Sequence, residues 1–181
     1  IAFSGKREEF DQAARWLDKL CKLCGCPEEA VFVTPGNHDV DRSVVDKSDP
    51  LKDLRTLLRQ SGDKAARELD RRLKADQDAL YARPLAEYLR FAERYQCPIS
   101  AARPFWEANL PLNDGSLLRL RGLCSVWISD KSDDNRTGRL LLGETATVLQ
   151  QEAGVEYMTL CHHPSEWLLD EDRVRERFRQ R

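Results

Sequence analysis

A chain of 181 residues is long enough to bury one sizeable hydrophobic core, so we expect a single domain. Its content of 41% hydrophobic and 33% charged residues is typical of a soluble globular domain. The formal net charge of -2 gives no basic field that would select nucleic acid or a membrane surface as an obligatory partner. No apolar run approaches the roughly 20 residues of a membrane helix, and the first residues show no secretory signal pattern.

The chain opens with Ile1, Ala2 and Phe3, which we interpret as the tail of a strand or the loop after it. From Phe10 to Cys24 the apolar residues recur at the spacing of one helix face, and a glycine and a proline follow. A helix followed by a strand forms half of a βαβ crossover. We therefore expect its first strand just upstream of Ile1.

Three cysteines, Cys21, Cys24 and Cys26, form a C-x-x-C-x-C motif at the end of this helix. The spacing suits zinc binding or redox chemistry, but no second C-x-x-C completes a four-ligand site. Because Cys21 and Cys24 continue the apolar face, we interpret them as packing residues. Six cysteines in a chain of this length do not indicate a disulfide scaffold, so we expect a reducing, cytoplasmic compartment.

A short apolar run at residues 30–33 predicts a strand that is buried on both faces. Asn37, His38 and Asp39 then lie just beyond its carboxyl end, where open α/β sheets place their ligands. Asn37 can offer an amide oxygen to a cation, and His38 can carry a proton near neutral pH. Asp39 can fix the tautomer of a neighbouring imidazole.

The quartet from Gly36 to Asp39, after an apolar strand and a proline, resembles the GNHD signature of the calcineurin-like metallophosphoesterases, a superfamily of two-metal phosphoester hydrolases. Gly-Asn is also a common turn dipeptide, so the interpretation depends on further blocks. In this family an earlier strand ends in a metal-bridging Gly-Asp, commonly followed by a few residues and then Ser-Gly. Ser4 and Gly5 match that pair, and the Gly-Asp would fall immediately before Ile1, with an Asp-x-His strand earlier still.

Amphipathic helices are predicted after Arg42, beginning at Asp49 and restarting after Pro84. Their basic surplus is too small to predict nucleic-acid binding, and we interpret the charges as a solvated face. We expect residues 43–96 to form a helical insertion that shapes substrate access or binds a protein partner.

The chain then changes to strands, with a tight turn at Asn113, Asp114 and Gly115. Strands are predicted at residues 118–121 and 124–129, and a short helix at 145–152. Between them runs a polar loop. Its Asp133 and Asp134 are interpreted as part of a solvated turn, with a cation site as the alternative.

A second informative strand, residues 155–161, leads directly into His162, His163 and Pro164. Imidazole nitrogen suits borderline divalent ions such as Zn, Mn, Fe and Ni. The His-His-Pro stretch resembles the next block of the metallophosphoesterases, in which the first histidine binds the second metal. The alternative is two surface histidines at a strand end. All three histidines of the chain fall in these two blocks, which favours the metal site.

A helix is predicted over residues 166–181. The family would continue with another strand and a Gly-His-x-His block. The resemblance therefore covers most of the chain in layout but only two motif blocks in detail, and three expected ligand groups lie outside these residues.

The resemblance implies an α/β fold with two sheets packed face to face, and a single partial metallophosphoesterase domain over residues 1–181. It implies two divalent ions (Mn, Fe, Zn or Ni) bridged by hydroxide, with Asn37 and His162 as ligands. His38 would protonate or stabilise the departing oxygen, and Asp39 would hold His38. His163 and Arg42 would contact a ligand or face the substrate.

The implied substrate is a phosphate ester, namely a nucleotide, a nucleic-acid end or a phosphoprotein, and no membrane partner is expected. Monoester and diester hydrolysis both remain open. The second hypothesis is a metal-poor scaffold that keeps the fold and binds another protein through the helical insertion.

Overall fold

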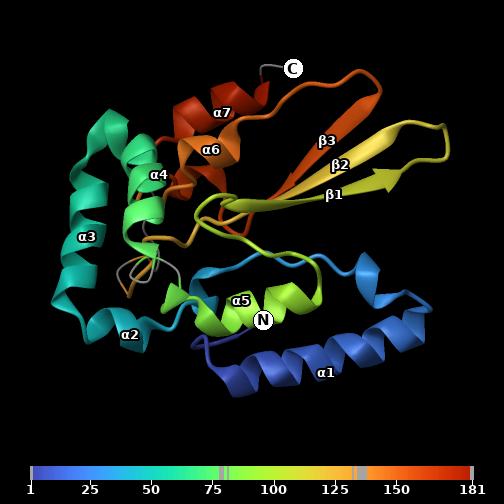
Figure 1. The fold of residues 1–181 in the computed structure, drawn as a ribbon, viewed down its shortest axis with the longest axis horizontal. Helices are drawn as coiled ribbons and strands as arrows, with labels where there is room; N and C mark the ends of the chain where they lie inside the picture. Colours follow the sequence, from blue (N-terminus) through green and yellow to red (C-terminus); the bar gives the residue numbers. More distant parts are fainter. Residues whose placement is uncertain (1, 78–79, 81, 132, 134–137, 180–181) are drawn as a thin grey trace.

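The computed structural model describes residues 2–77, 80, 82–131, 133 and 138–179. In these residues the fold is mixed α/β, with one three-stranded sheet and helices around it. Figure 1 shows α1 and α5 together along one side, the sheet on the other side, and α2, α3 and α4 gathered at one end. The fold class is thus confirmed at the level of mixed α/β.

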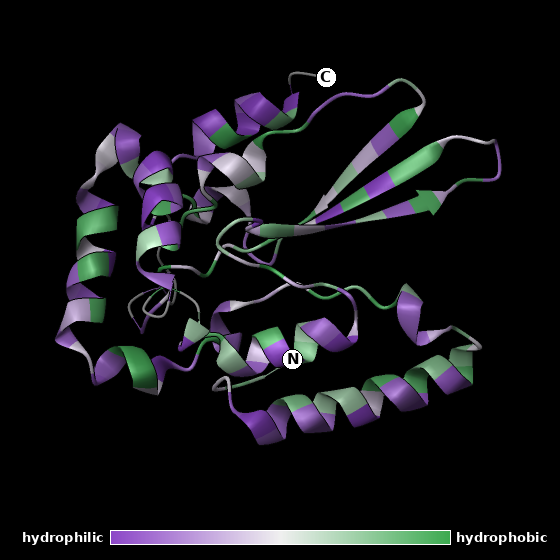
Figure 2. Cartoon of the chain, in the orientation of Figure 1, coloured by the Kyte–Doolittle hydropathy of each residue, from purple (hydrophilic) through white to green (hydrophobic). Residues whose placement is uncertain are grey.

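Helix α1 (Arg7–Cys24) packs on α5 (Ala86–Arg94) and begins the larger of two hydrophobic clusters. The centroid of the Phe10 ring lies 5.2 Å from that of Phe91 and 6.3 Å from that of Tyr88. The predicted helix and its end are confirmed, because Gly25 stops α1 in the left-handed conformation at φ 63°. Figure 2 shows hydrophilic and hydrophobic positions along the same helix, as an amphipathic element requires.

The predicted helical region is confirmed as helices. It contains α2 (Arg42–Asp46), α3 (Asp49–Gln60) and α4 (Ala65–Ala75), with a 3-10 turn at Gly62–Lys64. The leucines at positions 58, 69 and 73 are fully buried and join this region to the larger cluster. No helix within the described residues has both the length and the apolar character needed to cross a bilayer.

The sheet has the order β1-β2-β3. Strand β1 (Phe105–Pro111) runs antiparallel to β2 (Leu117–Leu123), and β3 (Val155–Leu160) runs parallel to β2. The predicted turn joins β1 to β2, and Gly115 supplies its positive φ of 85°. Trp106 faces Gly122 in the register, and a Cβ at Gly122 would lie 2.0 Å from the indole. The missing side chain therefore makes room for a fully buried tryptophan.

Two predicted strands are wrong. Residues 31–36 are extended but join no sheet among the described residues, because side chains satisfy the Val33 backbone. Its carbonyl accepts from Trp106 Nε1 at 2.8 Å and Tyr88 Oη at 3.2 Å, and its amide lies 3.4 Å from Cys97 Sγ. Residues 124–129 are a buried loop instead of a strand, since full burial gives an apolar run whether or not the backbone pairs.

Two predicted helices are shorter than expected. α6 covers only Glu144–Thr147, and α7 begins at Glu171 and ends at Arg179. Leu168 forms a parallel bridge with Leu140, which separates a 3-10 turn at Ser165–Trp167 from α7 and prevents one continuous helix. Residues 180–181 lie outside the described part of the chain.

Asp133 is buried and paired, so its interpretation as a solvated turn residue is wrong. Its carboxylate accepts from Arg59 at 2.9 Å, from Ser129 Oγ at 2.5 Å and from the Asp130 amide at 2.6 Å. Arg59 therefore ties α3 to the buried loop that follows β2. Asp134 lies outside the described residues.

We predict that Tyr88→Phe lowers the free energy of unfolding by about 1 kcal/mol, because one buried hydrogen bond to Val33 is lost while Trp106 keeps the carbonyl satisfied. Urea denaturation measures the change. Tyr157→Phe is the matched control, since the Tyr157 hydroxyl bonds at the surface. An equal effect of both substitutions would contradict the anchoring role of Tyr88.

Candidate functional site

The candidate site begins at the end of the extended segment that Val33 anchors. Asn37–Asp39 forms one 3-10 turn, in which Asn37 and Asp39 are buried and His38 is exposed. The turn therefore presents one side chain to solvent and keeps two inside. Asn37 is 7% exposed, so its side chain is packed within the turn.

The Asp39 carboxylate holds the backbone around it. Its Oδ2 accepts from the Gly36 amide at 2.8 Å, and its Oδ1 accepts from the Ala2 amide at 3.1 Å. The expectation that Asp39 directly holds the His38 ring is corrected by this geometry. Asp39 instead fixes the turn and the chain segment beside it.

His38 is oriented by Phe3. The His38 Nδ1 lies 3.0 Å from the Phe3 carbonyl oxygen, and the two rings stack with centroids 5.5 Å apart. Because a carbonyl oxygen only accepts, Nδ1 carries the proton in the neutral ring and Nε2 is the acceptor. Asp39 thus acts on His38 indirectly, by binding the Ala2 amide next to Phe3.

The segment that carries Phe3 is itself fixed against the turn. Gly5 has a φ of +67°, and a Cβ there would lie 2.7 Å from backbone atoms of Asp39, Val40 and Asp41. Glu9 accepts from the Ser4 amide at 3.0 Å and from the Ser4 hydroxyl at 3.1 Å. Ser4 and Gly5 therefore both have a structural role. Ser4 is held by Glu9, and only glycine at position 5 allows the two backbone segments to approach so closely.

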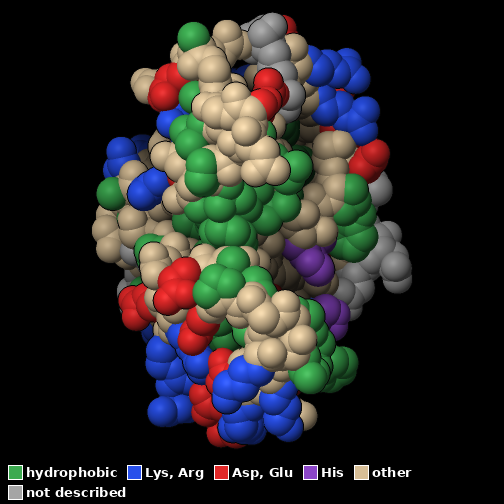
Figure 3. Space-filling view, turned by 90° about the vertical axis from the view of Figure 1, so that its right-hand side faces the viewer, with side chains coloured by type: hydrophobic (Ala, Val, Ile, Leu, Met, Phe, Trp, Pro, Cys, Tyr) green, Lys and Arg blue, Asp and Glu red, His purple; other side chains and the backbone are tan. Residues whose placement is uncertain are grey.

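His162 lies against the turn from the opposite direction. A Cβ at Gly36 would stand 2.9 Å from Cε1 and Nδ1 of His162, so the imidazole covers the space that a side chain would take. His162 is exposed, and Figure 3 shows histidine atoms on one face of the molecule beside a broad hydrophobic area. The fold thus brings the two sequence blocks together.

His163 turns inward instead. It is buried, its Nδ1 lies 2.8 Å from Ser125 Oγ, and its ring stacks on Trp167 at 5.1 Å between centroids. Its Nε2 is buried without a hydrogen-bond partner in the described residues. His163 also lines a hollow of about 300 Å³ with Cys161 and α7. Ser125 and Trp167 had no sequence signal, because no motif includes them.

The two neighbouring imidazoles have different electrostatic surroundings. Partial burial lowers the pKa of His162, while the Asp39 carboxylate acts in the opposite direction. Burial lowers the pKa of His163 to about 4, and His162 adds to that shift. Both rings are therefore largely neutral near pH 7, the form in which imidazole binds a cation.

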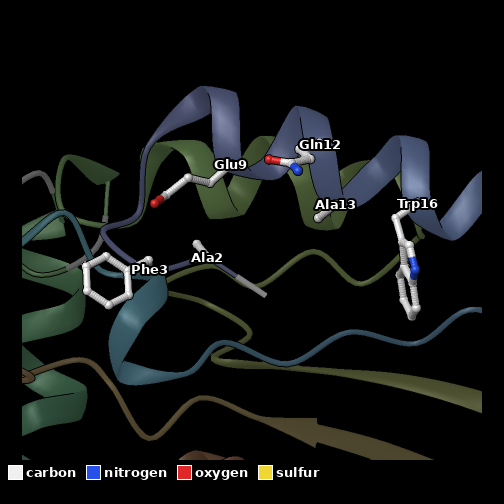
Figure 4. Close-up of a pocket in the computed structure, with 6 residues that line it drawn as sticks. All are labelled: Ala2, Phe3, Glu9, Gln12, Ala13 and Trp16. Atoms are coloured by element: carbon white, nitrogen blue, oxygen red, sulfur yellow. The ribbon is translucent and has the colours of Figure 1, made fainter.

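A second hollow of about 520 Å³ adjoins Phe3 (Figure 4). It is lined by Ala2, Phe3, Glu9, Gln12, Ala13 and Trp16. Arg42, the remaining predicted site residue, is half-buried at the first turn of α2, directly after the turn segment.

The described residues do not gather the ligands that a binuclear metal centre needs. No group of three or more His, Cys, Asp or Glu side chains in the described part of the chain could hold a metal ion. Both Asp39 oxygens bind backbone amides, and the other two predicted ligands, the buried Asn37 and the exposed His162, would each offer only a neutral donor atom. Two neutral donors suit a share in one ion's shell, and they do not fit a complete binuclear centre.

No protein-family model, no curated protein and no solved structure matches this chain.

We predict that Gly36→Ala displaces the His162 ring, because the new methyl group would overlap it. The ring Cε1-H resonance of His162 should shift in NMR spectra while that of His163 moves less. Gly154→Ala is the control, because a methyl group at Gly154 would meet no atom within 4 Å and the positive φ of +75° adds backbone strain without a ring overlap. An unmoved His162 resonance would show that the two blocks do not touch in solution.

Proposed function

We propose that this chain carries part of the active site of a metal-dependent phosphoester hydrolase of the calcineurin-like type. The observation that supports it is the contact of the His162 ring with Gly36, beside Asn37 and His38. Packing alone gives no reason for an exposed imidazole to lie against the glycine that precedes Asn37 and a second exposed imidazole, since the two come from separate segments of the chain.

In this proposal Asn37 and His162 each donate to a divalent ion, and further ligands come from beyond the described residues. Two such ions would polarise the phosphoryl group and activate the attacking water. His38 supplies proton chemistry, because Phe3 holds its Nδ1-H and leaves Nε2 facing solvent. Arg42 faces the phosphate ester, and His163 supports the position of His162 from inside.

The remaining expectations belong to the same proposal. The two-sheet sandwich would be completed around the single sheet described here, and the helices from α2 to α5 would shape access for a nucleotide, a nucleic-acid end or a phosphoprotein. A cytoplasmic location fits the unpaired cysteines.

The second candidate is a metal-poor scaffold that binds a protein partner through its helices. Two observations favour it. Both carboxylate oxygens of Asp39 accept hydrogen bonds from backbone amides, and no group of three metal-binding side chains is found in the described residues. The two candidates differ in turnover. The hydrolase should cleave bis-p-nitrophenyl phosphate or p-nitrophenyl phosphate with Mn²⁺, and the scaffold should not.

We predict that His38→Ala in the full-length protein lowers kcat by about 100-fold or more, because a proton-transfer group typically contributes a factor of 10² to 10⁴. Bound metal, measured by elemental analysis, should be largely retained. Lys52→Ala, which removes an exposed charge from α3, is the control and should leave kcat unchanged. Full activity of His38→Ala would remove His38 from the mechanism.

We predict that His162→Ala weakens metal binding by roughly 10-fold or more, since a direct ligand is lost. His163→Gln should weaken it less, because its side chain has no surface position from which to bind the ion. Metal titration by calorimetry compares the two. Circular dichroism checks that each variant is folded, and a larger loss for His163→Gln would invert the assignment.

A further inference from the structure

The cysteines at the end of α1 do not pack as the sequence predicted. Cys24 is exposed, and Cys21 and Cys26 are half-buried. Cys21, Cys26 and Gly25 line one open hollow of about 630 Å³ between α1 and α5. Packing along the apolar face of α1 therefore does not account for cysteine at these three positions.

The turn at Gly25 brings two of the thiols together. The Cys26 amide donates to the Cys21 carbonyl at 2.9 Å, and Gly25 is left-handed, which is the Schellman arrangement. In that motif the side chains of these two positions commonly touch. With standard bond lengths, this hydrogen bond keeps the two Cα atoms within about 6.8 Å. Disulfides span Cα separations of about 4.4 to 6.8 Å.

The alternative pair, Cys21 and Cys24, is less suited. Residues three apart on a helix have Cβ atoms roughly 5 to 6 Å apart, whereas a disulfide needs about 3.5 to 4.5 Å. The electrostatic influence on the Cys21 thiol also comes more from Cys26 than from Cys24. The geometry therefore selects Cys26 as the partner.

Arg94 holds the surroundings of this pair in place. Its guanidinium binds Asp18 on α1 at 2.6 Å and Glu28 just after the turn. Burial raises the pKa of the Cys21 thiol, and Cys26, Glu28 and Asp18 raise it further. Because the thiolate is the attacking species, a raised pKa lowers the fraction of Cys21 that can react at neutral pH.

We propose that Cys21 and Cys26 form a reversible dithiol site that exchanges with small-molecule disulfides such as glutathione disulfide. One thiolate attacks the glutathione disulfide, releasing one glutathione and forming a mixed disulfide. The second thiolate then attacks the protein sulfur and releases the second glutathione. The protein loses two hydrogen atoms, and one glutathione disulfide is reduced to two thiols. The product pins the turn at Gly25 to the end of α1.

Tryptic mapping tests this pairing directly, because Lys22 separates the cysteines. The reduced protein is incubated with glutathione disulfide, free thiols are alkylated, and the digest is analysed by mass spectrometry without reduction. Peptide 20–22 should be disulfide-linked to peptide 23–42 in the wild type and in Cys24→Ser. Cys26→Ser should lower the linked product by about 10-fold or more.

Three outcomes would overturn the proposal: linkage that persists in Cys26→Ser, a Cys24–Cys26 bridge that leaves Cys21 alkylated, or glutathione adducts alone. Circular dichroism verifies that each variant is folded. Oxidation of the wild type in concentrated urea is the second measurement. There the preference for Cys21–Cys26 over Cys21–Cys24 should disappear, and an unchanged preference would show that the turn does not select the pair.

Discussion

The position of the candidate site depends on one carbonyl group, that of Val33. Trp106 from β1 and Tyr88 from α5 both donate to it, so the sheet and the helical layer hold the same peptide. An extended segment without strand neighbours would otherwise leave buried polar groups unsatisfied at a cost of about 1 to 3 kcal/mol each. Here side-chain donors take the place of the hydrogen bonds that a neighbouring strand would make. The position of Gly36, three residues later, is thereby fixed.

Two glycines then set how closely the loops approach. Gly36 lets the His162 ring occupy the space of a side chain, and Gly5 lets residues 2–6 lie on the backbone after Asp39. These close contacts leave little freedom for the His162 ring to leave Gly36 or for residues 2–6 to leave the backbone after Asp39. The site is therefore organised by absent side chains as much as by the polar groups that carry the chemistry.

The sequence predicted the periodic elements well and the irregular ones poorly. α1 and β3 follow from apolar spacing, and Gly25 from its role as a helix stop. Residues 124–129 were assigned to a strand because burial on all sides has no period that distinguishes a strand from a buried loop. Asp133 was assigned to solvent because its partner, Arg59, lies 74 positions away and has no local signal. The motif residues themselves were found, but not the contacts of Asp39, which depend on Ala2.

The adjacent histidines illustrate the limit of motif reasoning. His162 and His163 lie in a bend just beyond β3, where one imidazole lies beside Gly36 and the next beside Ser125 and Trp167. The rings meet edge to face with centroids 4.6 Å apart. The sequence distinguishes the two histidines only by their resemblance to a family motif, whereas the fold distinguishes them by exposure, since His162 is exposed and His163 is buried. Because Ser125 and Trp167 fix the buried ring, the edge-to-face contact with it restricts the side-chain rotamers open to His162.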